Sequence, residues 1–427
     1  MMTDAMKTEQ GPATNDERTL GVEDSALTVA SALGHIDRLF TPTHAHTVGV
    51  EIEMFLQPEG VREPPAFGVA AAVSHELQDH LSGRLTFEPG GQIELSSNPA
   101  ADLQSLADEV DCDLRRLAHG LGRVGLQATT RRDTDAPLPD RVLHNPRYDA
   151  MERYFLPWNP YGLEMMRATA ALQVNVDVGA TASEVADRWT LLYAIGPALV
   201  AAFGNSPSAA REGGWKSRRL RSWLGLDPAR TATPTLDGRH AGPAGYAQWA
   251  LDAPLMLTQM DGHDWLAPRD VSFRDWILRG TEVVDRRCPA RLADLDLHLT
   301  TLFPFVRPKG YFEVRYLDMP PGHWWIVPTA VIHAVISGPR AADAARAICE
   351  GTEDLWRSAA HYGLQDRRLR RAAEELLELS IENLQETPGA RRVAARIDRY
   401  RERWTSRGLS PADLCGASEN WLFPQQP

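Results

Sequence analysis

Residues 48–55 read VGVEIEMF, a stretch in which apolar and polar side chains alternate. Alternation with a period of two is typical of a β-strand, so the apolar residues fall on one face and Glu51 and Glu53 on the other. The apolar face predicts packing against a core. The opposite face carries two carboxylates with no cation between them, and like charges this close repel unless a positive group lies nearby.

Three other stretches repeat this pattern: residues 90–96 (GGQIELS), 171–178 (ALQVNVDV) and 311–318 (YFEVRYLD). Their polar faces carry Gln92, Glu94 and Ser96; Gln173, Asn175 and Asp177; and Glu313 and Arg315. A single polar-faced strand is most often a solvated sheet surface. Four such strands in one chain, rich in carboxylates, instead predict one sheet whose open face forms a binding site.

The glutamates expected to converge on that face are Glu51, Glu53, Glu94 and Glu313, with Glu88 at the rim. Mg²⁺ prefers oxygen ligands and usually takes one or two carboxylates from a protein, so this set could serve roughly two or three ions. Arg315 lies on the same face, and its planar guanidinium suits a phosphoryl group. Divalent cations, an arginine and neutral amides together predict an electrostatic clamp for phosphoryl transfer.

The composition narrows the class of protein. The chain has 427 residues, of which 43% are hydrophobic and 24% charged, as is ordinary for a globular protein with a large core. Its net charge of −12 argues against a broad contact with nucleic acid. Its only lysines are Lys7, Lys216 and Lys309, and none falls in the G-x-x-x-x-G-K-[ST] frame, so a Walker loop for ATP is excluded.

The cysteines and the N-terminus indicate the compartment. The four cysteines are far apart and form no C-x-x-C pair, which argues against a zinc site or a disulfide framework and favours a reducing environment. The N-terminus lacks the basic and apolar regions of a signal peptide. No apolar run approaches the roughly 18 residues needed to span a bilayer. We therefore expect a cytoplasmic protein without membrane or nucleic-acid partners.

The chain divides into a leader and one large domain. Residues 1–20 are polar and aperiodic, which predicts a disordered leader, and residues 21–427 are expected to form a single domain. Residues 205–270 are rich in Gly, Pro, Trp and Arg, which favours a loop-dominated insertion. Residues 339–405 carry two apolar stripes at helical spacing and predict a helical C-terminal part. Earlier helices are expected at about 25–40, 66–82, 100–123, 181–203 and 327–337, and strands at 47–56, 85–96, 169–178 and 310–316.

Four segments resemble the glutamate–cysteine ligases: GVEIE (49–53), FEPGGQIELS (87–96), ALQVNVD (171–177) and YFEVRYLD (311–318). The closer similarity is to the plant-type branch and its bacterial relatives, above all the ergothioneine-pathway ligases of actinobacteria. The matches run in family order from about residue 47 to 325. The segments 87–96 and 311–318 are far more specific than Glu-x-Glu alone.

The resemblance implies an α+β, glutamine-synthetase-like catalytic fold. In that fold a curled antiparallel sheet forms a funnel, with helices on its convex side and here a helical C-terminal region. Glu51, Glu53, Glu94 and Glu313 would bind Mg²⁺, with Gln173 at a metal or nucleotide position. Arg315 would act in catalysis with Glu53 and Glu313 and face the ATP phosphates. Further substrate or nucleotide contacts are expected at Asn175, Glu88, Gln92, Arg218 and Arg153.

The implied reaction uses ATP and two or three Mg²⁺ ions. The γ-carboxylate of glutamate would attack the γ-phosphate of ATP, and the amine of cysteine would then displace phosphate to leave γ-glutamylcysteine. The acceptor pocket is expected to draw on residues 145–166, where an ion pair on a helix is the alternative role for Arg153. Other ligases of this fold, a guanidino-type phosphotransferase and a non-catalytic metabolite-binding scaffold stay open, as does the oligomeric state, a monomer included.

Overall fold

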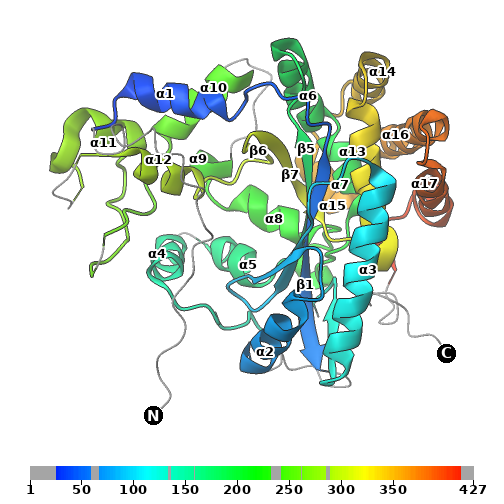
Figure 1. Cartoon of the computed structure of the whole chain (residues 1–427), viewed down its shortest axis with the longest axis horizontal. Coiled ribbons are helices and arrows are strands. Elements are labelled where there is room, and N and C mark those ends of the chain that lie inside the picture. Colours follow the sequence, from blue (N-terminus) through cyan, green and yellow to red (C-terminus); the bar gives the residue numbers. More distant parts are fainter. Residues whose placement is uncertain are drawn as a thin grey trace.

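The computed structural model describes residues 26–58, 67–132, 136–157, 159–231, 242–260, 262–284 and 289–414. The leader expected over residues 1–20 lies outside these ranges. Figure 1 shows the described elements arranged around one sheet, seen nearly edge-on, with helices on both sides of it. Within this part of the chain, no helix is both long enough and apolar enough to cross a membrane.

All the strand pairings of the sheet are antiparallel. Its strands are β1 (Val48–Pro58), β2 (Arg84–Phe87), β3 (Ile93–Ser96), β4 (Leu126–Thr129), β5 (Ala171–Asp177), β6 (Val306–Pro308) and β7 (Tyr311–Asp318). They lie in the order β2-β3-β1-β5-β7-β6, and β4 pairs with the end of β1. The four polar-faced stretches therefore do share one sheet, as the alternation predicts.

The strand register brings the predicted polar residues face to face. Glu53 on β1 lies opposite Glu94 on β3, and Glu51 lies opposite Gln173 on β5. Asn175 on β5 is in turn opposite Glu313 on β7. Directly opposed residues of an antiparallel pair lie on the same face with Cβ atoms roughly 5 Å apart, so these side chains form one continuous polar surface.

The other face of the sheet is the core. Val50, Ile52, Val174 and Val314 are each at most 1% exposed. Burying one such side chain contributes about 1.5–3 kcal/mol to stability. Helices on the right of Figure 1 cover this face: α3 (Leu103–Gly122), α7 (Gly196–Phe203) and α13 (Ile326–Ile336), with α16 (Arg367–Glu386) and α17 (Arg391–Arg403) packed behind them.

A second group of helices lies on the left of Figure 1. Beside the polar face are α4 (Pro146–Phe155), α5 (Tyr161–Arg167), α8 (Arg218–Gly225) and α9 (Pro228–Thr231). Farther out are α1 (Val29–Arg38), α10 (Gly242–Asp252), α11 (Phe273–Arg279) and α12 (Leu292–Leu299). The remaining helices are α2 (Phe67–Gln78), α6 (Ala182–Ala194), α14 (Pro339–Cys349) and α15 (Trp356–Tyr362). The helical C-terminal part predicted over 339–405 is thus confirmed as α14 to α17.

Three expectations about secondary structure need correction. The strand expected over 85–96 is two strands, β2 and β3, joined by a turn. The helix expected over 181–203 divides into α6 and α7, because Pro197 cannot donate the backbone hydrogen bond that would continue α6. The short strands β4 and β6 were not expected, since three or four residues carry too little alternation to detect.

The expected loop at 205–270 is partly helical, with α8, α9 and most of α10 inside it. Two of its prolines stand where helices begin: Pro228 opens α9, and Pro243 is in the first turn of α10. Proline is tolerated there because a first-turn N–H has no partner within the helix. These two prolines are therefore compatible with helices, and buried aromatic residues such as Trp223 and Trp249 anchor the helices of the segment.

Candidate active site

Three carboxylates come together on the polar face of the sheet. Glu53, Glu88 and Glu94 each offer an oxygen, and these atoms all lie within 4.8 Å of one another. Strand pairing positions two of them, because Glu53 and Glu94 are direct neighbours across β1 and β3. Among the described residues this is the one group of three such side chains with the spacing of a metal site.

A tight turn brings Glu88 into this group. The backbone N–H of Glu88 donates to the carbonyl of Gln92 at 2.8 Å, and Gly91 adopts a φ of 86°, which favours glycine. A Cβ on Gly90 would lie 2.2 Å from the carbonyl oxygen of Arg167, so only glycine fits there. The sequence placed Glu88 at the rim of the sheet as a substrate or nucleotide contact. The structure instead places it beside the two strand glutamates.

The buried side chain of Gln92 also stabilises this turn. Its side chain is 2% exposed, and its Nε2 donates to the carbonyl of Thr169 at 2.8 Å. Thr169 lies just before β5, so this hydrogen bond ties the turn to the start of β5, which lies beyond β1 in the sheet. The predicted contact of Gln92 with substrate or nucleotide stays a prediction, and the observed bond gives the residue a structural part in placing Glu88.

Burial and mutual repulsion disfavour the ionised form of all three carboxylates. Burial, with the charge of Glu51 and the other glutamates added to it, raises the pKa of Glu94 to about 7. The pKa of Glu88 is raised well above its usual range by burial and by Glu53 and Glu94, and burial raises the pKa of Glu53 as well. A hard divalent cation would reverse this repulsion, so the group fits Mg²⁺ by its oxygen ligands and its charge.

A chain of hydrogen bonds links Glu53 to Arg315. One oxygen of Glu53 accepts from the N–H of Ala171 at 2.8 Å, and the other accepts from Nε2 of Gln173 at 3.4 Å. The Oε1 of Gln173 accepts from Nη1 of Arg315 at 2.6 Å. The oxygen through which Gln173 would bind a metal is therefore already bonded to Arg315. Asn175, predicted as a substrate contact, donates to Glu51 at 3.2 Å.

Glu313 lies in a cationic part of the same face. Its side chain is 1% exposed and contacts Arg315, with Lys309 Nζ at 3.1 Å and Arg307 Nη1 at 3.3 Å. Burial alone would raise the pKa of Glu313, but Arg315, Arg307 and Lys309 outweigh it and hold the pKa at about 2. Glu313 is thus an ionised carboxylate between cations. It stands apart from the three-carboxylate group, and its predicted role as a metal ligand stays a prediction.

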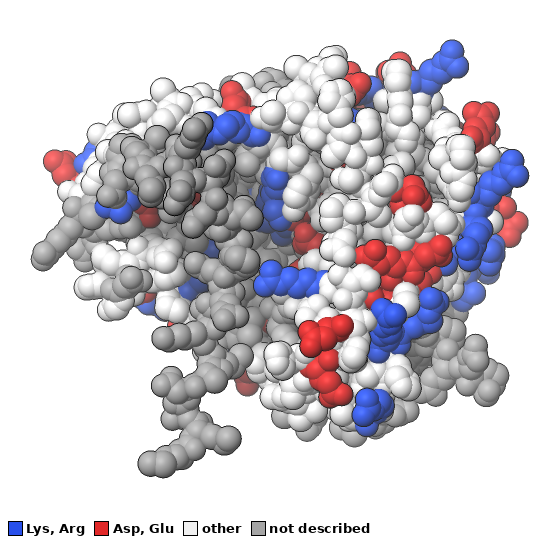
Figure 2. Space-filling model, viewed as in Figure 1, with Lys and Arg blue, Asp and Glu red and all other residues white. Residues whose placement is uncertain are grey.

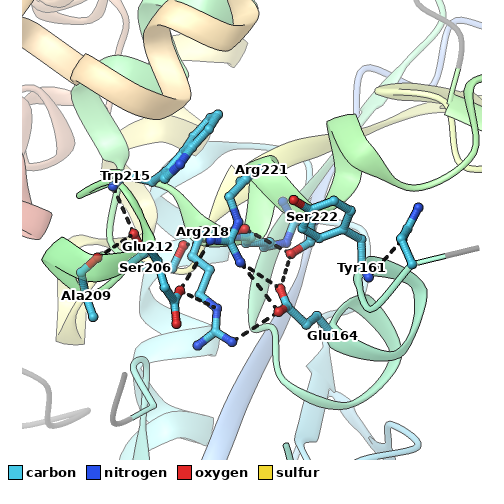
Figure 3. A network of polar contacts seen from close by, with 12 residues as sticks. Tyr161, Glu164, Ser206, Ala209, Glu212, Trp215, Arg218, Arg221 and Ser222 are labelled. Carbon is cyan, nitrogen blue, oxygen red and sulfur yellow. Dashed lines mark hydrogen bonds and ion pairs between the residues drawn. The ribbon is translucent and has the colours of Figure 1, made fainter. Parts of the chain in front are cut away.

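Arg218 belongs to an ion-pair network at the edge of the site (Figure 3). Its Nη2 lies 3.3 Å from Glu164, and its Nε lies 3.8 Å from Glu212. Arg221 pairs with the same two glutamates at 3.2 and 3.3 Å, and the hydroxyl of Ser222 donates to Glu164 at 2.6 Å. The predicted substrate contact of Arg218 would have to compete with these carboxylates.

The next residue, Arg219, reaches the sheet itself and was not singled out from the sequence. Its side chain is 3% exposed, and its Nη2 donates to the carbonyl of Arg315 at 2.6 Å. Its Nε and Nη1 are buried and have no acceptor among the described residues. Successive helix residues point about 100° apart, so only the burial of α8 distinguishes Arg219 from Arg218. Both side chains, with Asn205 and Ser206, line one small cavity.

Arg153 takes the alternative role that the sequence left open for it. Its side chain on α4 is 53% exposed and pairs with Asp264 at 2.5 Å. An ion pair this exposed contributes little to stability. The structure does not bring Arg153 into the group of glutamates, so its predicted contact with a substrate carboxylate stays untested.

The raised pKa of Glu94 predicts a pH-dependent effect of Glu94→Gln. An unfolded glutamate titrates near 4.5, so between that pH and about 7 the folded protein holds a proton that the unfolded chain releases. The free energy of unfolding therefore falls as the pH rises through this window, and glutamine removes that dependence. In the presence of a chelator, we compare the Tm of the variant with that of wild type at about pH 5.5 and at about pH 8. The difference, variant minus wild type, is expected to be roughly 2–5 °C larger at the higher pH.

Scanning calorimetry of both proteins checks this expectation. Buried histidines such as His298, whose pKa is lowered to about 3 by burial, titrate alike in the two proteins and cancel in the difference. Adding Mg²⁺ at the higher pH should raise the Tm of wild type more than that of the variant. A Tm difference that is the same at both pH values would contradict the repulsion between these carboxylates.

Known proteins match this chain over most of its length. The model of the glutamate-cysteine ligase family 2 (GCS2) matches residues 47–420. A "Glutamate--cysteine ligase EgtA" of Mycobacterium tuberculosis is 37% identical over 86% of this chain and 84% of the relative. The corresponding EgtA of Mycolicibacterium smegmatis is 36% identical over 78% of this chain and 79% of the relative. A chloroplastic glutamate–cysteine ligase of Medicago truncatula is 29% identical over 70% of this chain and 61% of the relative.

A solved structure supports the fold. The glutamate–cysteine ligase of Francisella tularensis, in complex with AMP, matches with a TM-score of 0.51. The match covers 87% of this chain and 84% of that one at 12% sequence identity, which bears on the fold alone. It confirms the expected α+β architecture with an open antiparallel sheet. The family match spans every strand that carries the carboxylates and Arg315, so the chain belongs to the glutamate-cysteine ligase family 2.

Proposed function

We propose that this protein is an ATP-dependent ligase that joins the γ-carboxylate of glutamate to the amine of cysteine. The observation that carries the proposal is the polar sheet face, where the Glu53, Glu88 and Glu94 group lies one hydrogen-bonded residue, Gln173, from Arg315. The family match and the similarity to mycobacterial EgtA support the choice of substrates. The resemblance in sequence to ergothioneine-pathway ligases supports ergothioneine biosynthesis as the use of the product, γ-glutamylcysteine.

The residues that would hold Mg²⁺ are Glu53, Glu88 and Glu94, with Glu51 next to them on β1. When bound there, the cation would neutralise phosphate charge and keep these carboxylates ionised at neutral pH. This assignment differs from the sequence-based one by including Glu88 and by omitting Glu313 and Gln173, both of which bond to Arg315. It is supported by spacing and electrostatics: the three oxygens lie close together, and their pKa values are raised by burial and repulsion.

The cationic part of the face would bind the phosphoryl group during transfer. Arg315 presents a planar guanidinium whose Nη1 is held by both Gln173 and Glu313, and which lies over the ring of Trp223 at 5.5 Å. A guanidinium fixed in this way is already oriented for the charge that develops on phosphate oxygens. Burial gives these interactions their strength, because water does not screen them as it does at the surface.

Arg219 is suited to the carboxylate of an amino-acid substrate. Two of its nitrogens lack acceptors within the described structure, and it lies close enough to Glu53 for their charges to interact. A substrate carboxylate would satisfy those donors and bring the reacting γ-carboxylate beside the phosphate-binding arginine. No side chain is required to act as a nucleophile, because the substrate itself carries the attacking oxygen.

A three-substrate assay tests the proposal. Purified protein with ATP, Mg²⁺, glutamate and cysteine is expected to yield equimolar ADP, phosphate and γ-glutamylcysteine, measured by chromatography and mass spectrometry. Equal rates with any amine in place of cysteine would overturn the acceptor. A phosphorylated metabolite without free phosphate would identify a phosphotransferase of this fold. Metal binding without ATP turnover would identify a metabolite-binding scaffold.

A further inference from the structure

A basic groove lies on the helical side of the molecule, away from the polar face of the sheet. It has a volume of about 460 Å³ and runs between α17 and the short 3₁₀ helix η3 (Gly322–Trp325). Its walls carry four arginines and two aromatic rings: Arg391, Arg392, Arg396, Arg399, His323 and Trp324. In Figure 2, blue side chains gather along the edge of the molecule where Figure 1 draws α16 and α17.

The positive charge of this groove is only partly compensated. Arg396 pairs with Asp111 of α3 at 2.6 Å, and Arg392 lies 3.9 Å from Asp108, a pair so exposed that it contributes little. Arg391 and Arg399 have no carboxylate within ion-pair distance in the described part of the chain. The groove therefore has a net positive charge in a protein whose overall charge is −12.

Two further observations favour the binding of an anion in the groove. The Nη1 of Arg396 is buried and has no acceptor among the described residues, and a buried donor without a partner is costly. Arg391 and Arg392 also occupy the first turn of α17. The N-cap residue of this helix is Ala390, whose side chain cannot accept a hydrogen bond from the free backbone N–H groups of that turn. The N-terminus of a helix already carries positive partial charge, so cations there are unfavourable unless an anion offsets them.

The aromatic wall is held rigidly. The rings of His323 and Trp324 lie 4.4 Å apart, and Trp324 makes edge contacts with Tyr400 at 5.7 Å and Trp404 at 5.2 Å. Both His323 and Trp324 are half-buried. The groove thus combines fixed rings on one side with arginine side chains on the other, a combination that accepts a compact anion.

We propose that this groove binds a small anion with two or more phosphate groups, either free or carried by a nucleotide. Planar guanidinium groups match phosphate oxygens two at a time, and the volume is that of a site for one small ligand. The size of the groove and the negative charge of the whole protein favour such a ligand over nucleic acid. This site would be separate from the polar sheet face, because all its lining residues belong to η3 and α17.

Titration calorimetry with inorganic pyrophosphate in chelator tests the proposal. The sheet face also carries arginines, so wild type is expected to show two binding events. Arg391→Ala with Arg399→Ala should weaken one of them by at least about tenfold. The matched control removes two exposed arginines four residues apart on α16, through Arg367→Ala with Arg371→Ala, and should keep both events.

Three outcomes would overturn the proposal: a single event in wild type, two unchanged events in the α17 variant, or equal weakening in both variants. The same titration with ADP identifies the source of the phosphates. Equal losses for pyrophosphate and ADP mean that phosphate alone is recognised, and a larger loss for ADP than for pyrophosphate means that the rest of the nucleotide is recognised as well. Because neither arginine belongs to the sheet face, the turnover of the α17 variant should stay within about twofold of wild type.

Discussion

Glu53→Gln is expected to lower the turnover of the ligase reaction by about 10³-fold or more, since removing a ligand charge from a metal-assisted phosphoryl transfer costs several kcal/mol. Glu53 belongs to the three-carboxylate group and also accepts a hydrogen bond from Gln173, which in turn accepts one from Arg315. Glutamine has the same shape, and its amide oxygen can still accept from the N–H of Ala171. The variant should therefore fold normally and fail in catalysis.

The control for this variant is Glu76→Gln, which removes the same charge from a side chain that is 69% exposed. Its turnover should match that of wild type. Circular dichroism and the Tm in chelator confirm the fold of both variants, and Glu53→Gln should be no less stable there, because one repelling charge is gone. Normal turnover in Glu53→Gln would contradict the assignment of the three-carboxylate group as the Mg²⁺ site.

Arg315→Lys is expected to lower turnover by about 10²- to 10³-fold, because lysine keeps the charge and loses the planar fork that binds phosphate oxygens in pairs. The guanidinium of Arg315 donates to both Gln173 and Glu313 through Nη1 alone, and its Nε is buried without an acceptor among the described residues, so lysine would keep the first nitrogen's charge and lose the remaining donors. The fall should appear in turnover more than in the KM for ATP, since the charge on the phosphoryl group develops during transfer.

Arg274→Lys provides the matched control, because that arginine pairs with Asp252 at the surface and is remote in sequence from every strand of the sheet. It should leave both kinetic constants close to those of wild type. Initial rates of ADP release, measured at varied ATP, separate the two constants. If Arg315→Lys raised only the KM, the arginine would hold ATP without acting in the transfer.

The positions of Glu88 and Arg219 in the site could not be predicted from the sequence. The pattern of residues 87–96 placed Glu88 near the site and could not indicate that a turn folds it back beside Glu53 and Glu94. That approach depends on the fit of Gly90 against the backbone of Arg167, 77 positions away. Arg218 and Arg219 are equivalent as sequence, and only the packing of α8 on the sheet directs one to Glu164 and the other to Arg315.

The sequence by itself determined which side chains share the polar face. Residues two apart in a strand point the same way whatever surrounds them, so Glu51 and Glu53, or Glu313 and Arg315, were paired by backbone geometry alone. Only the tertiary structure decided the electrostatic role of each. Glu313 is ionised because Arg315 on its own strand, with Arg307 of β6 and Lys309 of the β6–β7 turn, outweighs its burial, while the pKa of Glu94 is raised because burial and the glutamates of β1 disfavour its charge. The cations beside Glu313 lie in its own hairpin, whereas burial and the β1 glutamates that face Glu94 come from distant segments, and their approach depends on packing rather than on local periodicity.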